Sequence, residues 1–264
     1  MLTSSPVEDR TLRSRFEVKY LVDPSLVPLL RKFILPFLRP DAFTKEPGAS
    51  YDICSLYLDS PDLALCRQTL LGIKNRFKVR IRSYTDDPLV PVYLEIKRRV
   101  DRIILKKRAI VDRERVPAVL DGRLPPREAV GAGSWENVSE FHHLVAVHGL
   151  RPVARVRYRR EAYQSASGEP LRITFDREVA CAETPGWSVS HTDGEWSETP
   201  VEGAIFEVKF THYYPSWVSD MVREFQLRQC SVPKYVLSMS RLRDIHHLPF
   251  RVGPPLKRVL PTTT

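Results

Sequence analysis

Basic and apolar residues alternate through the segment RFKVRIRSY, residues 76–84. Lys78, Arg80 and Arg82 share one parity, and the apolar residues between them take the other. Side chains alternate between the two faces of a β-strand, so these three cations line up on one face. A fold for this chain must therefore include a sheet with a strongly basic face.

The same alternation recurs on other expected strands. It occurs in the pairs Glu17 and Lys19, Glu95 and Lys97, Lys106 and Arg108, Tyr158 and Arg160, Arg172 and Asp176, and Glu207 and Lys209. A sheet with one solvated face also alternates, but such a face typically mixes neutral polar and charged residues. Arg and Lys dominate here, which favours a ligand-binding face, with a solvated face as the alternative.

The expected strands are short and follow one another closely. They span 13–22, 51–58, 76–84, 90–99, 102–111, 153–164, 171–176 and 204–210. Helical spacing of apolar residues predicts helices at 24–38, with Asp23 as a helix N-cap, and at 61–71, 136–148, 216–227 and 234–245. Eight antiparallel strands can close and so lose their edges. The sequence therefore predicts an α+β fold, a closed antiparallel eight-stranded β-barrel that forms a tunnel, with flanking helices.

The 264 residues suit one large domain or two small ones. We expect a flexible N-terminus at 1–12, the tunnel domain at 13–248 and a disordered tail at 249–264. The sequence has no run of about 18 apolar residues, so no membrane span is expected. The first residues lack the apolar core of a secretory signal. The cytoplasm is the expected compartment, which leaves room for a membrane protein as a partner.

The chain carries 41 Lys and Arg residues against 32 Asp and Glu residues, a formal net charge of +9. This balance favours an anionic partner such as nucleic acid, anionic lipid or a phosphate compound. Nucleic acid is not expected, because stacking on bases needs aromatic residues on the same face as arginine, and Phe77 opposes the basic row of its strand. Arginine binds phosphate through two parallel hydrogen bonds, and lysine supplies a compact charge. A chain of phosphates therefore suits a tube of such donors.

Glutamates lie within the same rows. Mg²⁺ and Mn²⁺ prefer carboxylate and water ligands, and such ions assist phosphoryl transfer by neutralising charge on phosphate oxygens. Glu17, Glu95 and Glu207 are therefore candidate ligands of Mn²⁺ or Mg²⁺. Each could instead pair with a neighbouring lysine, and this alternative stays open.

Taken together, these segments resemble the VTC domain, the catalytic module of polyphosphate polymerases, within the CYTH or triphosphate tunnel metalloenzyme superfamily. The segments that carry the resemblance are RFEVKYLV, SLYLDS, KVRIRSY, VYLEIKRR, ILKKRAI, VRYRREAYQ, LRITFD, IFEVKF and VPKYVLS. The resemblance implies an eight-stranded basic tunnel that takes the terminal phosphate of ATP and extends polyphosphate.

The resemblance also assigns roles to individual residues. It implies that Glu207 ligates the metal, with Glu17 and Glu95 as further metal candidates. The implied catalytic residues are Lys19, Arg80, Arg82, Lys97, Lys106 and Arg160. The implied substrate-binding residues are Tyr158, Arg172, Lys209 and Lys234.

Two positions depart from the pattern that the resemblance implies. Arg15 stands where the superfamily has the first glutamate of its E-x-E-x-K signature, which weakens a two-metal triphosphatase site. Pro233 stands where polymerases tend to have a second lysine, which weakens long-chain synthesis. Hydrolysis of triphosphate or polyphosphate, and non-catalytic sensing of a polyanion, are therefore the alternatives to polymerisation.

Overall fold

The computed structural model describes residues 14–101, 103–127, 130, 134–166, 170–184, 186–211, 214–243 and 245, apart from the side chains of residues 14 and 15. The segments 1–12 and 249–264, predicted to be flexible or disordered, lie outside these ranges. The expectations for those two segments stay predictions.

Ten strands in these ranges form one sheet, two more than predicted. Eight lie where the alternation of side chains predicts them. The additional strands, β2 and β9, are three and two residues long, too short for alternation to reveal. The strands are β1 Ser14–Val22, β2 Leu38–Pro40, β3 Tyr51–Asp59, β4 Arg76–Ser83, β5 Val92–Val100, β6 Ile103–Val111, β7 Arg151–Ser165, β8 Arg172–Glu183, β9 Ser197–Glu198 and β10 Ala204–Phe210.

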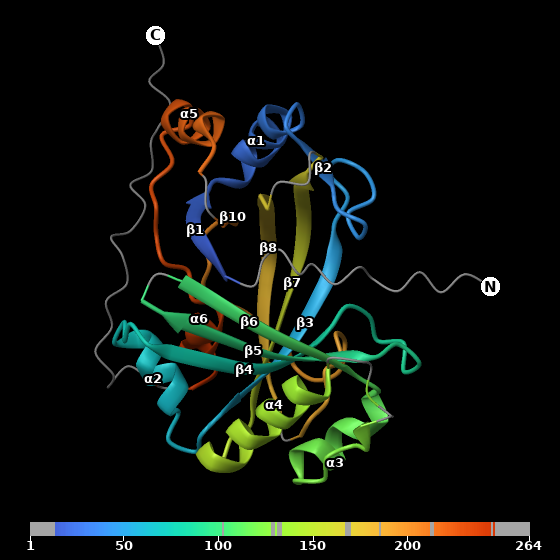
Figure 1. The fold of residues 1–264 in the computed structure, drawn as a ribbon. Helices are drawn as coiled ribbons and strands as arrows, with labels where there is room; N and C mark the ends of the chain where they lie inside the picture. The colour runs from blue at the N-terminus through green and yellow to red at the C-terminus, as the bar shows by residue number, and fades with distance from the viewer. Residues whose placement is uncertain are drawn as a thin grey trace, which may run out of the picture.

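The pairings are antiparallel and follow the order β7–β3–β4–β5–β6–β1–β10–β8. Strand β8 also pairs with β7, from Ala154 opposite Glu183 to Gln164 opposite Arg172. The short β2 and β9 pair with β7 and β8. Strands β4, β5 and β6 form an antiparallel meander, and Figure 1 shows them passing in front of β7 and β8.

Helices flank the sheet, as predicted for an α+β fold (Figure 1). Five of the six match predicted helices, and the short α3 does not. Asp23 caps a single turn before α1, where its carboxylate accepts a hydrogen bond from Ser25 N at 2.8 Å. The helices are α1 Val27–Ile34, α2 Ala64–Leu70, α3 Val116–Leu120, α4 Trp135–His148, α5 Ser216–Glu224 and α6 Lys234–Leu242.

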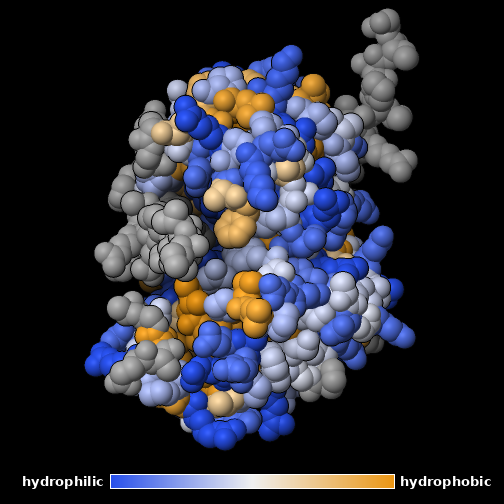
Figure 2. Space-filling view, turned by 90° about the vertical axis from the view of Figure 1, so that its right-hand side faces the viewer, coloured by the Kyte–Doolittle hydropathy of each residue, from blue (hydrophilic) through white to orange (hydrophobic). Residues whose placement is uncertain are grey.

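The side of the molecule at the right of Figure 1 is largely hydrophilic. Figure 2 shows hydrophobic groups above and below the middle of this face, separated by more polar surface. In the part of the chain that the structure describes, none of the helices is both long and apolar enough to cross a membrane.

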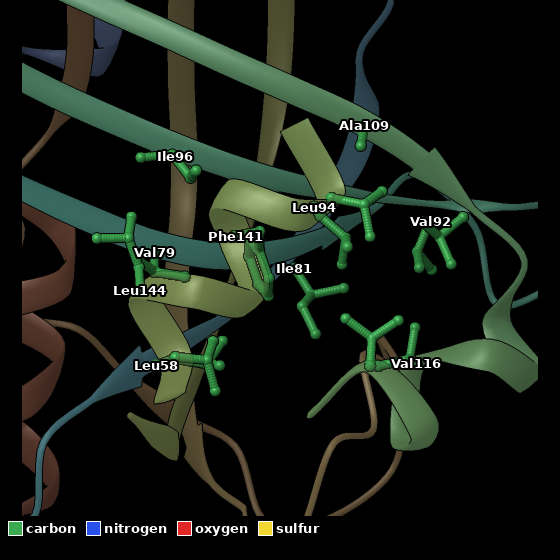
Figure 3. Close-up of a cluster of buried hydrophobic side chains, with 14 of the residues drawn as sticks. Leu58, Val79, Ile81, Val92, Leu94, Ile96, Ala109, Val116, Phe141 and Leu144 are labelled. Atoms are coloured by element: carbon green, nitrogen blue, oxygen red, sulfur yellow. The ribbon is translucent and has the colours of Figure 1, made fainter. Parts of the chain in front are cut away.

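A hydrophobic core lies between the meander and the helices α3 and α4. Val79 and Ile81 of β4 are fully buried there against Phe141 and Leu144 of α4 (Figure 3). The apolar parity of β4 thus faces the helices. The basic parity of the same strand must point to the other side of the sheet, toward the interior.

Helix α6 packs against the inner face of the sheet. Its residues Tyr235 and Val236 share a buried cluster with Ile53 of β3, Val156 of β7 and Ile205 of β10. These strand residues have the inward parity. Helix α6 therefore fills part of the interior, and its first residue, Lys234, enters the basic region.

Candidate functional site

Glu95 of β5 is the centre of one cluster of charges. Its side chain has no exposed surface and contacts Arg80, Lys106 and Arg108 at 2.7, 2.7 and 2.5 Å. Arg82 lies 3.8 Å away. Burial alone would raise the pKa of Glu95, but these cations outweigh burial and hold that pKa well below its usual value. Glu95 is therefore an ionised counter-charge at the point where three strands meet.

Glu207 of β10 and Asp176 of β8 form the centre of a second cluster. Lys19 and Lys209 lie 2.9 and 2.5 Å from Glu207. Lys234 reaches both carboxylates, at 3.3 Å from Glu207 and 2.6 Å from Asp176. Strands β1, β8 and β10 and helix α6 thus all contribute to this cluster.

Arg160 of β7 completes the second cluster. Its guanidinium donates two hydrogen bonds to Asp176, at 2.6 and 2.7 Å, in the planar fork geometry that carboxylates favour. Burial acts to raise the pKa of Asp176, but Arg160 and Lys234 lower it to about 2. Burial lowers the pKa of Lys209 to about 7, against the opposing effect of Glu207. The cluster holds two ionised carboxylates and a lysine that titrates near neutral pH.

Tyr158 of β7 connects the two clusters. Arg82 Nη2 donates a hydrogen bond to its hydroxyl at 3.2 Å. The guanidinium of Arg160 and the ammonium of Lys234 lie over its ring, 5.2 and 4.9 Å from the centroid. Side chains from both clusters therefore share one interior.

Two predicted site residues lie at the margins of this interior. Lys97 of β5 donates a hydrogen bond to Glu17 of β1 at 2.7 Å, beside the register pair Glu17 and Lys209. Arg172 of β8 is turned toward Asp41, at 2.5 Å, and lies 3.4 Å from Tyr51 Oη. All thirteen predicted site residues thus face the inner side of the sheet, although Arg172 contacts neither central cluster.

The interior carries a surplus of positive charge. Among the described residues, six carboxylates lie in or beside it: Glu17, Asp41, Asp59, Glu95, Asp176 and Glu207. The basic side chains number eleven: Lys19, Lys78, Arg80, Arg82, Lys97, Lys106, Arg108, Arg160, Arg172, Lys209 and Lys234. Buried cations in excess repel one another and favour a bound polyanion.

Some contributors were absent from the predicted site. Lys78 and Arg108 share rows with predicted residues, so their parity could have included them. Asp176 lies on the same face of β8 as Arg172, so the alternation of side chains could have included it too. Asp41 follows the three-residue strand β2, and no pattern in the sequence marks it.

The carboxylates differ in how well they fit a divalent metal. Within the described residues, no group of three or more His, Cys, Asp or Glu side chains is placed to hold a metal ion. Mg²⁺ commonly uses only one or two carboxylates together with substrate phosphates. Glu207 and Asp176, which share Lys234, fit that smaller set. Glu95 is contacted by four cations, as Glu207 is, but among the described residues none of its cations is shared with a second carboxylate, so it fits poorly.

An aromatic cluster borders the interior at the end of β4. The rings of Phe43 and Tyr84 stack at 5.1 Å, and Tyr51 lies 5.2 Å from Phe43. The guanidinium of Arg108 lies 4.4 Å from the ring centroid of Tyr93 and donates to Tyr84 Oη at 3.1 Å. Phe43 is 49% exposed. This end of the site therefore offers aromatic faces next to cations.

The family model described as VTC domain matches residues 14–243. No curated protein sequence matches the chain.

Solved structures of low similarity also align along most of the chain. A proposed adenylate cyclase from Bacillus halodurans is 11% identical, with a TM-score of 0.49, over 87% of this chain and 98% of its own. A protein from Pyrococcus horikoshii is 12% identical, with a TM-score of 0.45, over 87% and 99%. A proposed adenylyl cyclase from Hippeastrum, for which a dominant triphosphatase activity was described, is 14% identical, with a TM-score of 0.45, over 86% and 95%.

Proposed function

Because the chain belongs to the VTC domain family, we propose that it binds a chain of phosphates in its basic interior and transfers the terminal phosphate of ATP to polyphosphate. The observation that carries this proposal is the surplus of inward cations, gathered from seven strands and helix α6 around few carboxylates. A polyanion with oxygens on all sides supplies the missing negative charge.

The path of the strand pairings supports a tunnel for that polyanion. The eight longer strands form a circuit, because β8 pairs both with β10 and with β7. We propose that this circuit encloses the phosphates as a closed barrel, with the Glu95 cluster on one wall and the Glu207 cluster on the other. Tyr158 would lie beside the bound chain between them.

Catalysis would rest on positioning and charge neutralisation. We assign the grip on the transferred phosphate to Lys19, Arg80, Arg82, Lys97, Lys106 and Arg160. The remaining chain would be held by Tyr158, Arg172, Lys209 and Lys234. Each of these cations now contacts a carboxylate or a hydroxyl, so the phosphate oxygens would replace part of those contacts.

A divalent cation would be held by Glu207 and Asp176, with phosphate oxygens completing its ligands. When bound, Mg²⁺ or Mn²⁺ would neutralise charge that develops on those oxygens. Glu207 is the predicted metal residue, and Asp176 replaces Glu17 and Glu95 as its partner. Lys234 would move away from the two carboxylates to make room.

The aromatic end of the site suits the nucleoside of ATP. Phe43 presents an exposed ring that a purine could cover, and Arg172 lies beside Tyr51 of the same cluster. In this orientation the phosphates point inward. Hydrolysis is the second candidate function, favoured by Pro233 where polymerases tend to have a second lysine at the start of α6.

Incubation with ATP and Mn²⁺ tests the proposal, with ADP and polyphosphate followed over time. Polymerisation predicts ADP together with chains that grow longer. Phosphate release from ATP or tripolyphosphate without growing chains would assign the hydrolase. The absence of both products would reject an enzymatic role.

A further inference from the structure

Pairs of cations on neighbouring strands extend the basic interior to the start of β4 and the end of β5. Lys78 faces Lys97 across these two strands. Two residues nearer the strand ends, Arg76 faces Arg99. All four side chains share the inward parity of Arg80. Like charges directly opposite each other destabilise a sheet, so this arrangement works against the fold unless an anion binds there.

Within the described ranges, three of these four cations have no acidic partner. No carboxylate among the described residues pairs with Arg76, Lys78 or Arg99. The guanidinium groups of Arg76 and Arg99 each donate to one backbone carbonyl, of Ile73 and Asp101, and their other donors have no partner within the described ranges. Most of their hydrogen-bonding capacity is therefore free for a ligand.

The surface is hollowed where these strands end. The hollow is lined by Asn75, Arg76, Phe77, Arg98, Arg99 and Val100. Burial and the neighbouring Arg99 lower the pKa of Arg76. Burial, Lys97 and Lys19 lower the pKa of Lys78 well below its usual value. Burial and neighbouring positive charges thus disfavour the charged forms of Arg76 and Lys78, as expected of an anion site without its anion.

We propose that Arg76 and Arg99, with Lys78 leading to them, form an outer anion site for the part of a polyphosphate chain that extends beyond the interior. The inference rests on the proposed function, because it places the chain in the interior first. Arg82 pairs with Tyr93 near the aromatic end, six residues along β4 from Arg76, which corresponds to about 20 Å. The nucleoside and the outer site therefore lie at opposite ends of β4.

Chain length separates the outer site from the interior. A tripolyphosphate bound near Arg80 and Arg82 would not reach Arg76 and Arg99, so only longer chains would contact the outer site. We expect Arg76→Gln with Arg99→Gln to weaken binding of long-chain polyphosphate by about tenfold or more, since hydrogen bonds to charged groups contribute strongly. The same double variant should leave the affinity for tripolyphosphate unchanged. Calorimetric titration of the full chain with each ligand measures both.

Two variants control for charge and for structure. Lys107→Gln with Arg123→Gln removes two positive charges from the outer side, where both residues are exposed, and should leave both affinities unchanged. Arg76→Lys with Arg99→Lys keeps the charge and should restore most of the long-chain affinity, which a purely structural role of the arginines would not allow.

Long-chain affinity that does not depend on Arg76 and Arg99 would overturn this inference alone, and so would an equal loss for both ligands. Failure of the unaltered protein to bind either ligand would reject the inference and the proposed function together. Binding of tripolyphosphate without any gain for longer chains would leave the interior site standing and reject the outer one.

Discussion

Arg82 and Tyr158 meet across the interior, with Arg82 Nη2 3.2 Å from the tyrosine oxygen. Arg82 belongs to the cluster around Glu95, and the ring of Tyr158 lies under two cations of the cluster around Glu207 and Asp176. This contact makes one site from residues that are far apart in the sequence. A phosphate chain that replaces it would contact both clusters at once.

The first prediction concerns Glu95, the fully buried carboxylate among four cations. Glu95→Gln removes their common counter-charge and should lower the free energy of unfolding by about 3–5 kcal/mol. Glu140→Gln, which breaks the exposed ion pairs with Arg98 and Lys107 on the outer side, should cost less than about 1 kcal/mol. Urea denaturation of both variants measures the difference. Equal losses would show that the inner cations do not depend on Glu95.

A second prediction separates an enzyme from a polyanion sensor. Glu207→Gln keeps the shape of the side chain but removes the charge proposed to hold the metal. Turnover of ATP with Mn²⁺ should fall by about 100-fold or more. The affinity for tripolyphosphate should not fall, because the interior becomes more positive. A parallel loss of turnover and affinity would contradict a role in metal binding.

The third prediction is a dependence of stability on pH through Lys78. Its pKa in the folded protein lies well below the value of about 10.4 expected in the unfolded chain. Between those two values the unfolded chain binds more protons, so stability rises with pH in that window. At pH values below this window Lys78 is charged in both states, and its full destabilising effect on the folded protein is present.

Lys78→Met should therefore raise the free energy of unfolding by about 1 kcal/mol or more at the low end of the window. The gain should shrink as pH approaches about 10.4. Thermal unfolding across pH measures this, with the exposed Lys74→Met as the matched control. A gain that is the same at every pH would show that Lys78 does not titrate as proposed.

A fourth prediction tests the placement of the nucleoside. Phe43→Ala should raise the KM for ATP by about fivefold or more, because stacking on a base contributes roughly 1–3 kcal/mol. It should leave tripolyphosphate binding unchanged. Phe37→Ala is the matched control, since Phe37 is 42% exposed and stacks on Trp217 instead. An equal effect of the two variants on ATP would argue against the aromatic end.

Much of this architecture was predictable from the alternation of residues along each strand. The alternation predicts that Lys78, Arg80 and Arg82 share one face of β4. Val79 and Ile81, on the opposite face, are buried in the hydrophobic core, which confirms this prediction. Strand β8 was predicted too short, because a bulge near Glu178, whose φ is +54°, shifts the alternation. A regular period cannot extend through such a bulge.

Other features depended on contacts between distant segments. The acidic partner of Arg172 is Asp41, which lies 131 positions away and outside any alternating run. The packing of α6 against inward-facing strand residues also lies beyond a local pattern, because its apolar spacing would suit an outer helix equally well. Tertiary packing, rather than local sequence, decides both.

A crystal structure with tripolyphosphate and Mn²⁺ is the sharpest test of whether the basic interior binds phosphates. We expect phosphate oxygens within hydrogen-bonding distance of Arg80, Arg82, Lys106 and Arg160, with Lys234 displaced from Glu207 and Asp176. Tripolyphosphate bound only on the outer surface, with the ion pairs around Glu95 and Glu207 intact, would contradict this expectation.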